Sequence, residues 1–222
     1  AYGSSTPVAP RSVIILFIAL LFGLATPFGI IYLMEILDTT IRGRKDIEDK
    51  LSIPFLGDIP EYHGSTRQGS VVVRDNGRDS VSEAFRLIRS NLGFMSVKSG
   101  KLQIIMVTSS NPHAGKTFVT TNLAMTLALA DKKVVIVDLD LRRRTLSKQM
   151  GQRDNRNGVS GYISGTIANL NDIVFQSGLH ENLDIIFAGL QPPNPAEMLL
   201  SEKFDEFMAD LRKRYDYVVI DS

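Results

Sequence analysis

The residues best suited to chemistry form a phosphate-binding loop. Segment 110–117 reads Ser-Asn-Pro-His-Ala-Gly-Lys-Thr and follows the apolar run 104–107. In such a loop, backbone N–H groups and a helix N-terminus bind phosphate oxygens, Lys116 bridges the terminal phosphates, and the Thr117 hydroxyl reaches Mg²⁺. Gly115 stands where a side chain would most obstruct the phosphates. The segment therefore predicts a Walker A loop, and the alternative is an ordinary strand-to-helix turn with a solvated lysine.

Three aspartates stand at the ends of two further apolar runs. The run 133–138 ends in Asp138-Leu-Asp140, and the run 217–221 ends in Asp221. Because the carboxyl ends of parallel strands lie at one edge of a sheet, we expect the three carboxylates to converge beside the phosphate loop. Carboxylates suit both Mg²⁺ binding and general-base catalysis. Taken singly, each aspartate is more simply a helix N-cap or a turn residue.

Alternating apolar patterns supply the elements that position these residues. They predict helices at 80–97, 117–130, 170–176 and 201–213, and strands at 102–108, 133–138, 183–187 and 217–221. The segments up to 165 and around 192–195 read as Gly/Asn-rich and Pro-rich loops. Strands alternating with helices predict an α/β fold of the P-loop NTPase type, with a mostly parallel sheet and flanking helices.

The N-terminal part contains a long uncharged run. Residues 13–34 carry no charged side chain, and as a helix they would extend about 33 Å, which matches the hydrocarbon core of a bilayer. We therefore expect one transmembrane helix at 13–37, and the alternative is a buried helix of a soluble protein. Four basic residues follow between positions 42 and 50, whereas Arg11 alone precedes the run. The positive-inside rule then places the C-terminal part in the cytoplasm.

The rest of the chain divides around this run. Residues 1–12 are a polar, proline-containing lead-in expected outside the cytoplasm, 38–78 a juxtamembrane segment and linker, and 79–222 a nucleotide-binding domain. The chain begins at Ala1 and ends directly after the last strand, so we expect a fragment of a longer protein. A net charge of +1 gives no support for a nucleic-acid partner, and the absence of cysteine excludes disulfides and thiol catalysis.

Together, these motifs resemble the bacterial tyrosine kinases (BY-kinases) joined to the polysaccharide co-polymerases of capsule and exopolysaccharide assembly. The resemblance covers essentially the whole chain. It rests on the order of segments 7–10, 38–41 and 56–60, Glu83-x-x-Arg86-x-x-Arg89, the Walker A loop, Asp138-x-Asp140-x-Arg142, segment 192–195 and Asp221. Residues 79–222 would then be a kinase domain truncated at its C-terminus.

The resemblance implies a membrane-anchored kinase that transfers the γ-phosphate of ATP to tyrosines of a neighbouring subunit. Lys116, Asp138 and Asp140 would be catalytic, with Asp138 as the base for the tyrosine hydroxyl. The ligands of Mg²⁺ would be Thr117, Asp138, Asp140 and Asp221. The residues expected to bind ATP are Ser110, Asn111, Pro112, His113, Ala114, Gly115, Lys116, Thr117, Phe118 and Arg142.

The resemblance also implies a location and partners. The protein would lie in the bacterial inner (plasma) membrane with its kinase domain in the cytoplasm, and it would act with the polysaccharide export and polymerisation machinery. Glu83, Arg86 and Arg89 are similar to the family's oligomerisation motif, so we expect a ring-like homo-oligomer that presents neighbouring tails to each site. An ion pair between Glu83 and Arg86 within one helix is the alternative.

Two features depart from the family pattern. His113 and Ala114 stand where the family loop usually has Gly-Glu or similar small residues. The six tyrosines form no cluster, so the acceptor tyrosines are expected beyond Ser222. Two other functions remain open. One is an ATPase switch of the partition or division-positioning type, whose signature lysine would stand at Asn111, and the other is a non-catalytic regulator of polysaccharide chain length.

Overall fold

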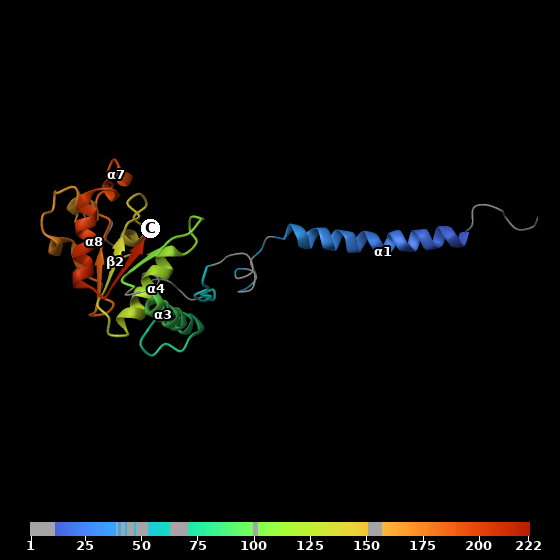
Figure 1. The fold of residues 1–222 in the computed structure, drawn as a ribbon, viewed down its shortest axis with the longest axis horizontal. Helices are drawn as coiled ribbons and strands as arrows, with labels where there is room; N and C mark the ends of the chain where they lie inside the picture. The colour runs from blue at the N-terminus through green and yellow to red at the C-terminus, as the bar shows by residue number, and fades with distance from the viewer. Residues whose placement is uncertain are drawn as a thin grey trace, which may run out of the picture. The chain divides into compact units, whose positions relative to one another are not determined.

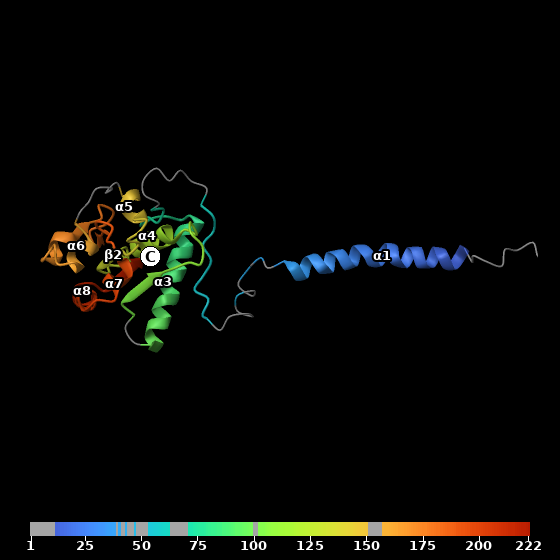
Figure 2. The same cartoon turned by 90° about the horizontal axis from the view of Figure 1, so that it is seen from above.

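A computed structural model describes residues 12–38, 40, 43, 47, 53–62, 71–99, 102–150 and 157–222 (Figures 1 and 2). The chain forms two units, Ala1–Phe55 and Leu56–Ser222. The first unit contains helix α1, Ser12–Leu37. Within the described residues, α1 provides the one stretch, Val13–Leu37, that is long and apolar enough to cross a membrane. Its 25 residues have a mean hydropathy of 2.6 and extend about 38 Å, more than the roughly 30 Å hydrocarbon core.

A five-stranded sheet forms the centre of the second unit. Its order is β1 (Ile104–Val107), β5 (Tyr217–Asp221), β2 (Val134–Asp138), β4 (Leu183–Ile186) and β3 (Val174–Gln176). The first four strands are parallel, and β3 is antiparallel to β4. The predicted α/β fold with a mostly parallel sheet is therefore confirmed. Asp221 is in register with Val107 on one side and Asp138 on the other, so β1, β5 and β2 end at the same level.

Helices cover both faces of this sheet (Figures 1 and 2). Alternate residues of β2 face opposite sides: Val134 and Ile136 pack with α3 (Ser80–Ser99) and α4 (Lys116–Ala128), whereas Val135 and Val137 pack with α6 (Val159–Ile163) and α8 (Glu202–Arg214). All five residues of β2 are buried, as expected for a parallel strand between two helical layers. Apolar burial of this kind stabilises the fold by about 25 cal/mol per Å².

The segment 170–176 differs from the predicted helix. Leu170–Ile173 form a single 3₁₀ turn, η1, and Val174–Gln176 form the edge strand β3. The side chain of Asn169 accepts a hydrogen bond from Asn171 N and caps only this turn. Phe175 then packs its ring 5.5 Å from that of Phe187. Tertiary pairing with β4 thus overrides a helical pattern that was only seven residues long. Further short helices, α5 (Thr145–Gln149), α6 and α7 (Pro195–Leu199), occupy segments predicted as loops.

The second unit begins at Leu56 rather than near residue 79. Asn91 on α3 donates a hydrogen bond from Nδ2 to the Leu56 carbonyl at 2.7 Å. Further along, the backbone N–H groups of Val72 and Val73 both donate to Oδ1 of Asn122 on α4, at 2.8 and 3.1 Å. Val73 is buried against α3 and α4. We call residues 71–78 the strap, because they run over α4 before α3 begins.

Candidate functional site

The predicted phosphate loop connects β1 to α4. Gly115 has φ +87° immediately before α4 starts at Lys116, and a Cβ there would meet nothing within 4 Å. Its backbone conformation, rather than lack of space, therefore favours glycine. His113 also has a positive φ, +62°, although it is not glycine. Lys116 Nζ donates to the hydroxyl of Ser109 at 3.3 Å, which directs the ammonium group back along the loop.

Asp221, at the end of β5, is hydrogen-bonded to the first turns of α4. Thr117 Oγ1 donates to Asp221 Oδ2 at 2.8 Å, and Thr120 Oγ1 donates to Oδ1 at 3.3 Å. Burial raises the pKa of Asp221, and these hydrogen bonds and the charge of Lys116 oppose that rise. The hydroxyl and carboxylate pair supplies hard oxygen atoms beside the lysine, a donor set that suits Mg²⁺.

Asp140 lies in the turn after β2. Its Oδ1 accepts a hydrogen bond from the backbone N–H of Arg143 at 2.9 Å, and its Oδ2 accepts from Thr145 Oγ1 at 3.4 Å. Asp140 borders the cavity described below, and its carboxylate also stabilises the turn through these hydrogen bonds. This second role was not visible in the sequence, where spacing alone suggested a metal ligand.

Asp138 is fully buried and faces α5. Its Oδ2 accepts hydrogen bonds from the Ser147 N–H at 3.3 Å and the Ser147 hydroxyl at 3.0 Å, and its Oδ1 accepts from Asp140 N at 3.1 Å. Burial raises the pKa of Asp138 to about 7, with smaller contributions from the charges of Asp221 and Asp140 in the same direction. A carboxyl group with this pKa exchanges its proton near neutral pH, as a general base must.

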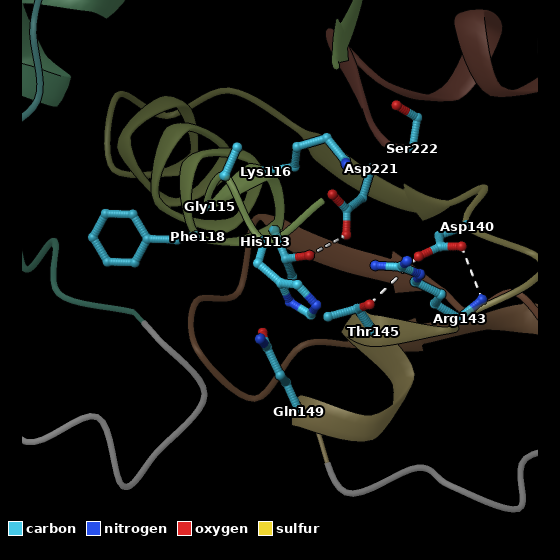
Figure 3. Close-up of a pocket in the computed structure, with 12 residues that line it drawn as sticks. His113, Gly115, Lys116, Phe118, Asp140, Arg143, Thr145, Gln149, Asp221 and Ser222 are labelled. Carbon is cyan, nitrogen blue, oxygen red and sulfur yellow. Dashed lines mark hydrogen bonds between the residues drawn. The ribbon is translucent and has the colours of Figure 1, made fainter. Parts of the chain in front are cut away.

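A cavity of about 240 Å³ brings these elements together (Figure 3). Its lining includes eight residues expected from the sequence: His113, Ala114, Gly115, Lys116, Thr117, Phe118, Asp140 and Asp221. Five other expected residues do not line it: Ser110, Asn111, Pro112, Asp138 and Arg142. Four residues without a prediction complete the lining: Arg143, Thr145, Gln149 and Ser222. Three of these, Arg143, Thr145 and Gln149, follow β2, where a turn and a five-residue helix give no periodic signal.

The cavity residues fit a phosphate-bound metal better than a metal held by protein alone. Among the described residues, no three Asp, Glu, His or Cys side chains gather closely enough to hold an ion. Mg²⁺ usually takes one or two carboxylates and completes its shell with water and phosphate oxygens. Asp221 and Thr117, with Asp140 across the cavity, match that partial donor set.

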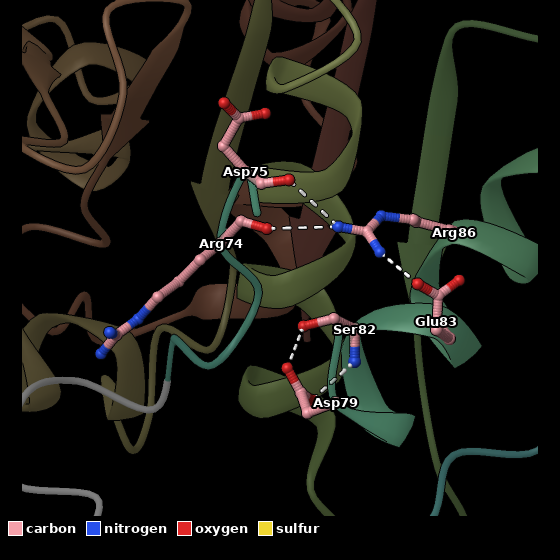
Figure 4. A network of polar contacts seen from close by, with 6 residues as sticks. All are labelled: Arg74, Asp75, Asp79, Ser82, Glu83 and Arg86. Carbon is pink, nitrogen blue, oxygen red and sulfur yellow. Dashed lines mark hydrogen bonds and ion pairs between the residues drawn. The ribbon is translucent and has the colours of Figure 1, made fainter. Parts of the chain in front are cut away.

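The residues of the expected oligomerisation motif make contacts within their own subunit (Figure 4). Arg86 forms an ion pair with Glu83, so the intrahelical alternative is present. Its Nη2 also donates to the strap carbonyls of Asp75 at 3.2 Å and Arg74 at 3.4 Å. Arg89 Nη1 donates to the carbonyl of Thr126, in the last turn of α4, at 2.9 Å. Arg86 thus connects α3 to the strap, and Arg89 connects α3 to the last turn of α4.

Known proteins resemble this chain in sequence. A family model described as an AAA domain (AAA_31) matches residues 102–222. A putative tyrosine-protein kinase in the cps region of Klebsiella pneumoniae is 29% identical over 230 residues, which cover 97% of this chain and 31% of the relative. The putative tyrosine-protein kinase CapB of Staphylococcus aureus is 33% identical over 154 residues, 68% of this chain and 64% of CapB. The chain spans about a third of the length of relatives such as the Klebsiella protein.

Solved structures share the fold as well. The kinase domain of the Escherichia coli tyrosine kinase ETK matches with a TM-score of 0.71 and 28% identity, covering 82% of this chain and 73% of that domain. The BceF tyrosine kinase domain matches with a TM-score of 0.70 and 30% identity, covering 83% of this chain and 77% of that domain. The likeness therefore extends over the unit that carries the cavity.

Proposed function

The chain belongs to the family of bacterial tyrosine-protein kinases, and we propose that it transfers the γ-phosphate of ATP to tyrosines of a neighbouring subunit. The observation that supports this most directly is that the phosphate loop and two acidic strand ends border one cavity. Lys116 comes from the loop, Asp221 from β5 and Asp140 from the turn after β2. A cation beside oxygen ligands for Mg²⁺ is the arrangement that phosphoryl transfer needs.

Each residue then has a role in the proposed reaction. The backbone of 110–118 and the start of α4 hold the phosphates, and Lys116 neutralises their terminal charge. Thr117, Asp140 and Asp221 would hold Mg²⁺, which supplies further charge neutralisation when bound. Asp138 accepts the proton of the tyrosine hydroxyl, whose ordinary pKa is about 10. Because Asp138 is bonded to Ser147 and does not line the cavity here, this step requires its carboxylate to leave Ser147 and turn toward the cavity.

We extend the proposal to location and partners. Helix α1 would anchor the chain in the bacterial inner membrane and leave the second unit in the cytoplasm, where ATP is present. The Klebsiella relative, a putative kinase in a cps region, supports a role beside the polysaccharide export and polymerisation machinery. A ring-like homo-oligomer through Glu83, Arg86 and Arg89 would bring the tyrosines of one subunit to the cavity of the next.

The proposal is tested by incubating the full chain, purified in detergent, with Mg²⁺ and ATP labelled in its γ-phosphate. A peptide carrying a tyrosine cluster serves as an added acceptor. We expect label on tyrosine, and a loss of about 100-fold or more in Lys116→Met and Asp138→Asn. Lys148→Met, which removes an exposed cation outside the cavity, is the matched control and should retain the activity.

Three results distinguish the functions. Labelled tyrosine that disappears in both variants supports the kinase. Release of inorganic phosphate without labelled protein or peptide would instead identify an ATPase switch. Nucleotide binding with neither reaction would indicate a regulator that uses nucleotide only to set its assembly.

A further inference from the structure

The two cations that line the cavity come from different elements. Lys116 stands at the start of α4, and Arg143 comes from the turn after β2. Figure 3 shows the Arg143 side chain directed into the cavity from the side of Asp140, with Lys116 and Asp221 across from it. A triphosphate carries about four negative charges, and Mg²⁺ cancels two of them. Arg143, in the turn after β2, therefore supplies the cavity with a second positive charge beside that of Lys116.

Two hydrogen bonds to Asp140 hold the turn that carries Arg143. The Asp140 carboxylate accepts from Arg143 N at 2.9 Å, and the Asp140 carbonyl accepts from Arg144 N at 2.9 Å. Leu141 is buried, and Arg144 has φ +54°. These contacts fix the backbone from which the Arg143 side chain leaves. Within the described residues, the Arg143 guanidinium makes no hydrogen bond or ion pair. Its donors remain available to a ligand.

The neighbouring arginine does not share this position. Arg142 precedes Arg143 by one residue and fits the sequence motif Asp138-x-Asp140-x-Arg142, but it does not line the cavity. Both side chains are exposed. In a tight turn, adjacent side chains leave the backbone in different directions. Arg143 therefore faces the cavity, whereas Arg142, one residue earlier, does not.

We propose that Arg143 contacts the γ-phosphate of bound ATP, an inference that rests on the kinase proposed above. The loop and the N-terminus of α4 suit the inner phosphates, because their N–H groups converge there. Arg143 approaches from the side of Asp140, across the cavity from Lys116 and the start of α4. A guanidinium offers two parallel donors to phosphate oxygens and stabilises the charge that spreads over them during transfer. Arg143 is thus a further binding and catalytic residue of the site.

The distinguishing measurement is the ratio of the affinities for ATP and ADP. Both affinities are measured by calorimetry on the full chain with Mg²⁺. A charge-assisted hydrogen bond contributes about 1.5–3 kcal/mol, which corresponds to about 10- to 100-fold in affinity. We expect Arg143→Met to weaken ATP binding by this factor while ADP binding changes less than about twofold. Arg143→Lys, which keeps the charge but not the paired donors, should recover part of the loss.

Two comparison variants sharpen the test. Lys148→Met removes one nearby positive charge outside the cavity and should leave both affinities unchanged. Arg142→Met tests the rival arginine of the motif. Loss of ATP preference in Arg143→Met but not in Arg142→Met supports the proposal. A parallel loss for ATP and ADP, no loss for either, or a loss confined to Arg142→Met would each overturn it.

The same data separate this inference from the kinase proposal. If the unmodified chain binds neither nucleotide, the nucleotide site itself is refuted and the role of Arg143 with it. If the unmodified chain binds ATP and labels tyrosine while Arg143→Met keeps its ATP preference, only the role of Arg143 is refuted. Unfolding by urea checks that each variant is folded, which the exposed position of Arg143 leads us to expect.

Discussion

Among the described acidic residues of the site, Asp138 is the one at which burial, neighbouring charges and hydrogen bonds together act most strongly on the carboxyl group. Its carboxyl group is fully buried beside Asp221 and Asp140, and its pKa is about 7. Ser147 opposes this rise through its hydroxyl and its N–H. A carboxyl group in this state holds its proton until the pH approaches neutrality, so the protonation of Asp138 and the position of α5 are coupled through Ser147.

Stability should therefore fall as the pH rises. The folded-state pKa of Asp138 lies above its unfolded value near 3.8, so its contribution is fully present below about pH 4 and is lost as the pH passes about 7. The pKa difference corresponds to at most about 4 kcal/mol. We expect Asp138→Asn, which stays neutral, to lose less stability than the unmodified chain between pH 5 and pH 8. Urea unfolding at both pH values measures this difference.

The exposed Asp172→Asn is the control and should follow the unmodified chain at both pH values. Burial also raises the pKa of Asp221, which acts in the same direction, so some pH dependence should persist in Asp138→Asn. An identical decline in the unmodified chain and in Asp138→Asn would show that Asp138 is already ionised in the folded protein at pH 5.

Residue positions in the site were predictable only where spacing determines them. The Gly115-Lys116-Thr117 sequence follows a strand and opens a helix, so its place in the cavity could be predicted. The choice between Arg142 and Arg143 depends instead on the turn that Asp140 closes and on the positive φ of Arg144. Sequence spacing carries no information about these dihedral angles. The same holds for Asp138, whose orientation is set by Ser147 nine residues later.

Among the elements, the strap depends on one side chain of α4. Asn122 is fully buried, and its Oδ1 accepts from two backbone N–H groups, those of Val72 and Val73. In Asn122→Ala, both donors would lose this acceptor, at a cost of about 1–3 kcal/mol. We expect faster hydrogen exchange at Val72 and Val73 and a lower free energy of unfolding. Exchange followed by mass spectrometry provides the measurement.

Asn91→Ala is the matched control for this prediction. It removes a donor to the Leu56 carbonyl and leaves the acceptor of Val72 and Val73 in place. Exchange at Val72 and Val73 should therefore stay slow in Asn91→Ala. Equal acceleration in both variants would mean that general destabilisation, and not the Asn122 amide, controls the strap.

Helix α3 was predictable because its apolar pattern repeats, and β2 because it is an uninterrupted apolar run. In α3, Val81, Phe85, Ile88 and Leu92 are buried at helical spacing, and every residue of β2 is buried. The elements that sequence patterns missed, α5, α6, α7 and β3, have three to five residues each. A helix of five residues shows too little of the 3.6-residue period to be recognised, and β3 is set by its pairing with β4. The predicted strands are as short, but an uninterrupted buried apolar run such as β2 is recognisable in the sequence.

At the scale of the whole molecule, the proposed assembly and the stability of one subunit involve the same side chains. Arg86 holds the strap, and Arg89 satisfies a carbonyl at the end of α4. We expect Arg86→Ala combined with Arg89→Ala to reduce the oligomer mass measured by light scattering in detergent. The subunit should also lose about 1–3 kcal/mol of stability, because the two arginines donate three hydrogen bonds to backbone carbonyls.

Glu83→Gln separates the two effects. It breaks only an exposed ion pair, which contributes about 0.2–1 kcal/mol, so the subunit should remain stable. Lower oligomer mass in folded Glu83→Gln or in the folded double variant supports the interface. An unchanged mass in both would leave these residues with a role inside the subunit alone.

The order of the sheet has a consequence for how the protein is made. Strand β5 lies between β1 and β2, so Val107 meets its partner Asp221 only after 114 further residues have been synthesised. At about 5–20 residues per second, the ribosome needs about 6–23 s for that length. Among the described strands, β1 pairs with β5 alone, so during this interval the backbone N–H and C=O groups on that edge of β1 have no strand partner. The proposed nucleotide site consequently lacks Asp221 until β5 emerges, and the unpaired edge of β1 is open to chaperones until then.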